Sequence, residues 1–199
     1  MFTGIVENTG IVESLNGQNP IKLAVRPEWP PQDIVMGESI AINGCCLTVV
    51  RYDKGLLFFD VTTETQKRTT LTGIKPAGIV NLERAMRLSD RVGGSLVLGH
   101  VDGIGYIKCV EQRGGATYVS ITATNEVIKM IVSQGGVTVD GVALTVVTVE
   151  GEHFVVSLIP HTLSITTLKF LTQGQPVNLE VDAIGRYVWN FWKNYAAER

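Results

Sequence analysis

The sequence predicts an all-β protein of two tandem antiparallel β-barrels followed by a C-terminal helix. The first observation is an internal duplication, since Ser39–Val50 matches Gly136–Val147 with an offset of 97 residues. The second is a strand-like alternation of β-branched residues, in which Asn43-Gly44 and Asp140-Gly141 are expected to form two-residue hairpin turns with positive φ. The turn spacing is typical of a barrel or a sandwich, and we favour closed barrels of about six short strands each.

The duplication also predicts the domain organisation. Thr69–Leu71 and Val80–Glu83 recur in the second half at the same offset, whereas Gly4–Glu7 matches Gly99–Asp102 with an offset of 95. Two residues were therefore gained or lost between these blocks, and a surface loop near Gln18–Pro31 is the expected place. We expect a first barrel over residues 1–95, a second barrel over residues 96–184 and a C-terminal helix over residues 185–199.

Helical patterns are scarce outside the C-terminus. Short helices are expected at Lys67–Leu71, Ser164–Leu168 and Asn125–Ser133. The segment Arg186–Tyr195 is rich in aromatic residues and lacks glycine and proline, so it is compatible with a further helix. Such a helix either packs on its own barrel or associates with another subunit. We favour association, because a helix this short is marginal without a packing partner.

Composition argues against several classes of partner and cofactor. The net charge of −2, from 17 basic and 19 acidic residues, offers no positive surface to nucleic acid or to an anionic membrane. No uncharged apolar run reaches the roughly 18 residues of a membrane span, and no secretory signal follows Met1. The three cysteines and three histidines lack the spacing of a disulfide framework or a metal site, and no phosphate-binding glycine loop opens a helix. We therefore expect a cytoplasmic protein without a metal or a nucleotide cofactor.

Polar residues that recur in both halves are candidates for ligand binding. Thr48 matches Thr145, and Thr65 matches Thr162, although threonine is also a common strand residue. If these residues line a surface, two similar sites would bind two copies of one molecule or two related molecules. The repeat thus indicates two ligand molecules per chain but does not identify the ligand.

Other candidates occur in one half only. A lone cysteine is more often a small buried apolar residue than a nucleophile, and a lone histidine is more often structural than catalytic. The asymmetry nevertheless suggests that one half hosts the reacting molecule and the other half hosts a donor. The positions that differ in this way are Cys46 against Ala143, Ser39 against Gly136, and His100 against Ile5.

Several motifs, in order along the chain, resemble the riboflavin synthase family. They are Met1–Glu7, Asn43–Val49, Gly93–Gly103, and Ile159–Thr162 followed by Thr166–Leu168. The resemblance spans essentially the whole chain. It implies two six-stranded Greek-key barrels, a C-terminal helix and a homotrimer in which each active site lies between the first barrel of one subunit and the second barrel of its neighbour. It also implies a small-molecule substrate, 6,7-dimethyl-8-ribityllumazine, and no cofactor.

The reaction that the resemblance implies is a dismutation. One lumazine transfers a four-carbon unit to a second, giving riboflavin and 5-amino-6-(D-ribitylamino)uracil. In the family, the acidic C7 methyl group of one molecule is deprotonated and the other molecule is activated at C7 by nucleophilic addition. The catalytic residues implied by motif match are Cys46, Ser39, His100, Thr48 and Asp182.

The resemblance also implies substrate-binding residues in each barrel, whose threonines and backbone groups are expected to hydrogen-bond the ring edges. For the first barrel they are Gly4, Ile5, Val6, Cys46, Leu47, Thr48, Asp60, Val61, Thr62, Thr63, Glu64 and Thr65, with Ser39 and His100 nearby. For the second barrel they are Gly99, His100, Val101, Gln134, Ala143, Leu144, Thr145, Ser157, Leu158, Ile159, Pro160, His161 and Thr162.

Some positions depart from the family pattern. Gln134 stands where lysine is common and Ala143 where serine is usual, so the second barrel lacks a charge and a side-chain hydrogen bond. Ser95 replaces a residue that is often histidine. The alternative function is a non-catalytic lumazine- or flavin-binding protein of the same fold. We favour the enzyme, because the Cys46 motif, Gly99–Val101 and the terminal helix are all retained; a trimer without a ligand would leave the duplicated threonines unexplained.

Overall fold

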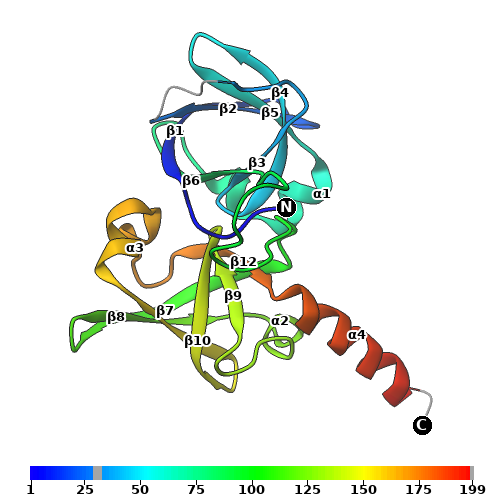
Figure 1. The fold of residues 1–199 in the computed structure, drawn as a ribbon, viewed down its shortest axis with the longest axis vertical. Coiled ribbons are helices and arrows are strands. Elements are labelled where there is room, and N and C mark those ends of the chain that lie inside the picture. The colour runs from blue at the N-terminus through cyan, green and yellow to red at the C-terminus, as the bar shows by residue number, and fades with distance from the viewer. Residues whose placement is uncertain (29–32, 198–199) are drawn as a thin grey trace.

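The computed structural model describes residues 1–28 and 33–197, which form two closed six-stranded antiparallel barrels (Figure 1). The strands of the first barrel are β1 (Asn8–Asn16), β2 (Ile21–Pro27), β3 (Ser39–Ile42), β4 (Cys45–Asp53), β5 (Leu56–Val61) and β6 (Ile79–Arg84). Those of the second are β7 (Gly103–Arg113), β8 (Ala116–Thr122), β9 (Gly136–Val139), β10 (Val142–Glu150), β11 (His153–Leu158) and β12 (Pro176–Val181).

The order of strands around each barrel is the same. It is β1-β2-β5-β4-β3-β6 in the first barrel, and the second barrel repeats it with the matching strands. In the first barrel, hairpins connect β3, β4 and β5 as neighbours. The preceding strand, β2, lies beside β5 and not beside β3, which is a Greek-key connection. The second barrel has the same connection. The predicted all-β fold of two duplicated barrels is confirmed.

Helical segments connect the strands and end the chain. They are α1 (Thr63–Arg68), the 3-10 helix η1 (Thr70–Gly73), α2 (Asn125–Ile128), α3 (Pro160–Ile165), the 3-10 helix η2 (Thr167–Phe170) and α4 (Ala183–Ala197). The helix expected at Lys67–Leu71 begins earlier, because the Thr62 hydroxyl accepts a hydrogen bond from the N–H of Thr65 and caps α1. Extended backbone at Thr69 then separates α1 from η1.

The other predicted helices differ in their bounds. The helix expected at Ser164–Leu168 begins at Pro160, a residue favoured in a first helical turn, and a break at Thr166 divides it. The helix expected at Asn125–Ser133 ends at Ile128, because the N–H groups of Met130 and Ile131 bond three residues back and tighten the chain into turns. The C-terminal helix is confirmed as α4, while residues 198–199 lie outside the described part of the chain.

Alternating apolar side chains fill each barrel. Ile40 and Phe59 in the first barrel and Ile121 and Phe154 in the second are fully buried. The duplication extends to the irregularities of the strands, since the register of β4 shifts after Val49 and that of β10 shifts at the matching position. Such bulges bend a strand sharply, which helps a small sheet close on itself.

The difference in length between the halves lies after Pro27. Strands β2 and β8 match with an offset of 95, whereas β3 and β9 match with an offset of 97. Much of the loop expected near Gln18–Pro31 is therefore strand β2, and residues 29–31 of it lie outside the described part of the chain. Among residues 1–28 and 33–197, no helix has the length and apolar character needed to cross a membrane.

The two predicted hairpin turns pack against each other and join the barrels. All four turn residues have positive φ, between 44° and 82°, as expected. A Cβ atom on Gly44 would lie 2.6 Å from the backbone nitrogen of Gly141, so only glycine permits this approach. Asparagine side chains cross the interface symmetrically: Asn81 donates to the carbonyl of Asp140 and Asn178 donates to the carbonyl of Asn43, both at 2.8 Å.

Asp140 lies buried in this interface. Its carboxylate accepts a hydrogen bond from the backbone N–H of Asn178 at 2.8 Å, just as the matching Asn43 accepts from Asn81 at 2.7 Å. Burial raises the pKa of the Asp140 carboxyl from 3.8 to about 7, and the Asn178 hydrogen bond opposes this increase.

Asp140→Asn is expected to stabilise the protein above neutral pH. Because the folded state binds the proton more tightly than the unfolded state, the stability of the wild type falls as pH rises from about 4 to about 7. At pH 8 the asparagine variant should gain about 2 to 4 kcal/mol of unfolding free energy, and near pH 4 the two should be similar. Urea unfolding at a series of pH values measures this. The reverse change, Asn43→Asp, should introduce the same pH dependence, and parallel pH profiles for wild type and Asp140→Asn would contradict the assignment.

Candidate functional site

Each barrel is contacted by a glycine-containing segment of the other barrel: Gly4–Val6 lies against the second barrel and Gly99–Val101 against the first. The carbonyl of Gly4 accepts a hydrogen bond from the N–H of Ala143 at 2.9 Å, and the carbonyl of Gly99 accepts one from Cys46 at 2.9 Å. Both glycines have positive φ, and a Cβ atom on either would lie within 2.5 Å of the side chain opposite. Close backbone approach therefore requires glycine at both positions.

This arrangement corrects the grouping expected from the sequence. Gly4–Val6 was expected with Cys46 and Gly99–Val101 with Ala143, but the structure places each segment against the other barrel. Val6 packs into the core of the second barrel and Val101 packs against the core of the first. A match between repeats identifies equivalent positions, but it does not show which barrel a connecting segment covers.

Most of the residues expected in the second-barrel site surround one cavity. Its volume is about 550 Å³, which is within the range of small-molecule sites. Leu158, by contrast, is buried in the barrel core, and Pro160 and His161 are exposed at the start of α3. The lining consists of apolar residues and a few polar groups: Gln134, Ala143, Leu144, Thr145, Val146, Val147, Ser157, Ile159 and Thr162.

Matching residues of the first barrel lie on the outer surface of β4, β5 and α1. Thr48 is exposed opposite Ser39, its partner across the strand pair. Asp60 matches Ser157 of the cavity and forms an ion pair with Lys22 at 2.7 Å. The hydroxyls of Thr62 and Thr65 hydrogen-bond each other at 3.1 Å.

The remaining residues expected in the first-barrel site are placed differently. Leu47 and Val61 face the barrel core. Thr63 donates to the side chain of Asn19, and Glu64 forms an exposed ion pair with Arg68.

Cys46 and Cys45 have different environments. Cys45 is buried, and burial raises the pKa of its thiol to about 12, so it stays protonated. Cys46 is partly exposed and contacts Gly99 across the barrel interface. His100 follows Gly99, and its carbonyl accepts a hydrogen bond from Arg186 of α4 at 3.2 Å. Cys46 is thus the accessible thiol of the pair, and it lies beside the Gly99–Val101 segment.

Asp182 begins the C-terminal helix. Its carboxylate accepts a hydrogen bond from the N–H of Ile184 at 2.8 Å, which is the position of a helix N-cap. The other carboxylate oxygen lies 3.6 Å from where a Cβ atom on Gly136 would be, and the hydroxyl of Ser95 lies 3.7 Å from the same point. Asp182 and Ser95 therefore both lie beside Gly136 at the start of β9, the counterpart of the Ser39 position.

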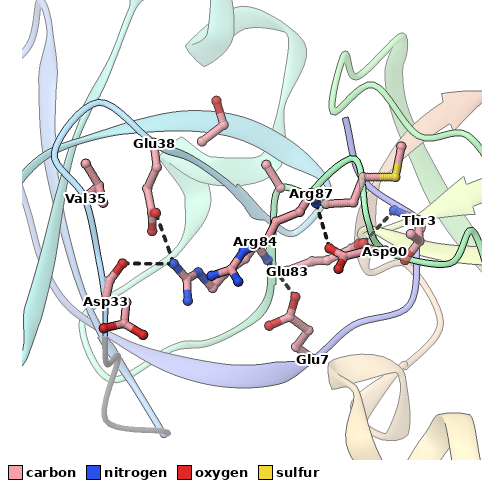
Figure 2. Close-up of a pocket in the computed structure, with 12 residues that line it drawn as sticks. Thr3, Glu7, Asp33, Val35, Glu38, Glu83, Arg84, Arg87 and Asp90 are labelled. Carbon is pink, nitrogen blue, oxygen red and sulfur yellow. Dashed lines mark hydrogen bonds and ion pairs between the residues drawn. The ribbon is translucent and has the colours of Figure 1, made fainter.

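A charged pocket of about 490 Å³ opens beside Ser39 (Figure 2). The guanidinium of Arg84 donates to the carboxylate of Glu38 at 3.1 Å and to the carbonyl of Asp33 at 3.2 Å. The backbone N–H of Arg84 donates to Glu7 at 3.2 Å, and burial raises the pKa of that carboxyl. Sequence reasoning missed this pocket because its arginine has an uncharged counterpart in the second half. Its groups pair with one another and hold the N-terminal segment against β6.

Comparison with known proteins assigns both barrels to one domain family. The family model described as lumazine binding domain matches residues 3–85 and 98–182. A curated relative from Bacillus subtilis (strain 168), named riboflavin synthase, is 41% identical over 192 residues, which are 96% of this chain and 89% of the relative.

Solved structures of the protein LumP have the same fold. The LumP complex with riboflavin has a TM-score of 0.81 and 26% sequence identity, and it covers 91% of this chain and 99% of LumP. The LumP complex with 6,7-dimethyl-8-(1'-D-ribityl) lumazine has a TM-score of 0.80 and 23% identity over the same shares of the two chains.

Proposed function

Because this chain belongs to the riboflavin synthase family, with two lumazine-binding domains in tandem, we propose that it acts on two molecules of 6,7-dimethyl-8-ribityllumazine. One molecule transfers a four-carbon unit to the other, giving riboflavin and 5-amino-6-(D-ribitylamino)uracil. This is a transferase activity. The observation that best supports it in the structure is the second-barrel cavity, most of whose lining residues were expected from the family motifs.

The proposed site binds a flat heterocycle by shape and by its polar edges. In the second barrel, Leu144 and Ile159 offer apolar surface, while Gln134, Thr145 and Ser157 offer hydrogen-bonding groups. Holding two reactants in one geometry can lower a barrier by about 7 to 11 kcal/mol, which suits a reaction between two identical substrates.

The catalytic roles centre on the first barrel. Nucleophilic addition requires a group such as the accessible thiol of Cys46 or a hydroxyl of Ser39 or Thr48, and these residues occupy the paired strands β3 and β4. His100 is brought close to these residues because the preceding residue, Gly99, accepts a hydrogen bond from the N–H of Cys46. Asp182 would act from the start of α4.

We also infer that the enzyme is a homotrimer whose sites are shared between subunits. Thr48, Thr145 and Gln134 are exposed in a single chain, so each proposed site is open on one side. Helix α4 extends away from the second barrel (Figure 1), and large apolar side chains on one of its faces are exposed. A neighbouring subunit would cover both surfaces.

A cytoplasmic location is the inference from cysteine usage. Cys45, Cys46 and Cys109 are all free thiols in the structure, and Cys46 and Cys109 are partly exposed. Unpaired cysteines of this kind are typical of proteins from a reducing compartment.

The test is incubation of the purified protein with 6,7-dimethyl-8-ribityllumazine and no added cofactor. Riboflavin absorbance and fluorescence should appear over many turnovers. Tight lumazine binding without product would instead support the alternative, a non-catalytic binding protein of the same fold.

Gln134→Lys is expected to tighten lumazine binding in the second barrel by about 3- to 10-fold, because a charged donor forms a stronger hydrogen bond than an amide. The backbone of Gln134 has φ of +65°, a conformation for which the first barrel has glycine at the matching position, Gly37. Glutamine already carries the backbone strain of a side chain in this conformation, so lysine should add no further strain. Equilibrium binding measures the change.

Gln134→Gly is the matched control. It should raise the unfolding free energy by about 1 kcal/mol by relieving backbone strain, and it should weaken lumazine binding by removing the donor. Identical binding curves for both variants and the wild type would exclude Gln134 from the site.

A further inference from the structure

A buried glutamate holds the N-terminal segment in place. Glu83, near the end of β6, is 4% exposed. Its Oε1 accepts hydrogen bonds from the N–H and the hydroxyl of Thr3 at 2.6 and 2.8 Å, and its Oε2 accepts one from the N–H of Gly4 at 3.1 Å. The carbonyl of the same glycine bonds Ala143, which lines the second-barrel cavity. A carboxylate of the first barrel is therefore connected to the ligand site of the second.

The mirror arrangement occurs at Glu180, the counterpart of Glu83 on β12. It too is 4% exposed, and its two oxygens accept hydrogen bonds from the N–H groups of Leu98 and Gly99 at 2.8 and 2.9 Å. The carbonyl of Gly99 bonds Cys46 of the first barrel. A carboxylate of the second barrel is connected in this way to the proposed site of the first.

Burying a carboxylate costs free energy unless hydrogen bonds satisfy its oxygens. Burial raises the pKa of both Glu83 and Glu180, and the hydrogen bonds from the clamped N–H groups oppose this rise. Each carboxylate nevertheless fixes two successive backbone groups in a segment whose carbonyl lies at a ligand site. Charge-assisted hydrogen bonds from both oxygens hold such a segment more rigidly than a single neutral bond would.

We propose that Glu83 and Glu180 are positioning residues that act crosswise, Glu83 on the ligand site of the second barrel and Glu180 on the ligand site of the first. Each glutamate places a glycine carbonyl, and the glycine in turn sets the position of the strand end that contacts the ligand. For the identity of the ligand, this inference rests on the proposed function.

The test uses Glu83→Gln and Glu180→Gln in the full-length protein. Glutamine keeps the shape of the side chain but turns an NH₂ group toward one of the clamped N–H groups, which removes an acceptor. Titration with 6,7-dimethyl-8-ribityllumazine is followed by NMR on the amides of Ala143 and Thr145 for the second barrel, and of Cys46 and Thr48 for the first. Glu83→Gln should weaken binding in the second barrel about 10-fold and leave the first within about 2-fold. Glu180→Gln should do the opposite.

A structural role alone would give a different result. If the glutamates only stabilise the fold, both variants should lower the melting temperature and leave binding unchanged at both barrels, or weaken it equally. Weakening confined to the barrel that contains the substituted residue would also overturn the proposal. Glu13→Gln is the matched control, because Glu13 forms an exposed ion pair with Arg26, and it should leave lumazine binding unchanged in both barrels.

Amide hydrogen exchange separates this proposal from the proposed function. In the ligand-free protein, Glu83→Gln should accelerate exchange at the Ala143 amide and Glu180→Gln at the Cys46 amide, since each amide bonds the carbonyl of a clamped glycine. Unchanged exchange at both amides would overturn crosswise positioning. Failure of the wild type to form riboflavin would overturn the proposed reaction, while binding and exchange would still decide the role of the two glutamates.

Discussion

Replacing Gly99 with alanine is expected to lower kcat/KM for riboflavin formation on the order of 1000-fold, through backbone strain and overpacking. The φ of Gly99 is +78°, a conformation that an L side chain adopts only with strain. An added Cβ atom would lie 2.5 Å from the Cβ of Cys46 and 3.0 Å from its backbone nitrogen, so the clash falls on the proposed site itself. Steady-state kinetics measures the loss, with circular dichroism as the check on folding.

Gly174→Ala separates strain from contact. Gly174 has φ of +82°, close to that of Gly99, but no heavy atom lies within 4 Å of its added Cβ. This variant should lose about 1 kcal/mol of stability and keep its activity within about 2-fold. Equal activities in the two variants would show that the Gly99–Cys46 contact does not shape the site.

Replacing Tyr187 and Phe191 together with serine is expected to convert the proposed trimer into monomers and to remove nearly all activity. Their side chains are 72% and 74% exposed in a single chain, and burying a large apolar side chain contributes about 1.5 to 3 kcal/mol. The loss recurs at every subunit contact of a symmetric trimer. Light scattering coupled to size-exclusion chromatography gives the mass. The face that we expect to be covered comprises Ile184, Tyr187, Val188, Phe191 and Tyr195.

Point substitutions test this face more cleanly than truncation of the helix. Arg186 donates to the carboxylate of Asp102 at 2.8 Å and to the carbonyl of His100, so its removal would disturb the first-barrel site directly. Lys193→Ser, on the side of α4 that faces α2, is the control and should remain trimeric and active. An active monomer would contradict a shared site, and a persistent trimer would place the interface elsewhere.

Local signals made the duplicated fold predictable from the sequence. The Asn43-Gly44 and Asp140-Gly141 pairs specify their turns through positive φ, and the alternation of apolar residues around them specifies which strand faces enter the barrels. The repeat also identified Thr145 and Thr162 as equivalent to residues of the first half, and both line the second-barrel cavity. Helix bounds were less predictable, because caps such as Thr62 depend on the exact path of the preceding strand.

The sequence by itself therefore determined the two barrels and their turns, since these follow from residue type and short-range periodicity. Most of the cavity lining was expected from the resemblance to the family, apart from the two threonines that the repeat identified. Only the tertiary structure decided that Gly4 covers the second barrel and Gly99 the first. It also decided that Glu83 and Glu180 hold those segments. The hydrogen bonds concerned join residues 79 to 82 positions apart, and no local pattern specifies contacts at that separation. They form because closing each barrel brings its last strand beside the segment that leads into its first.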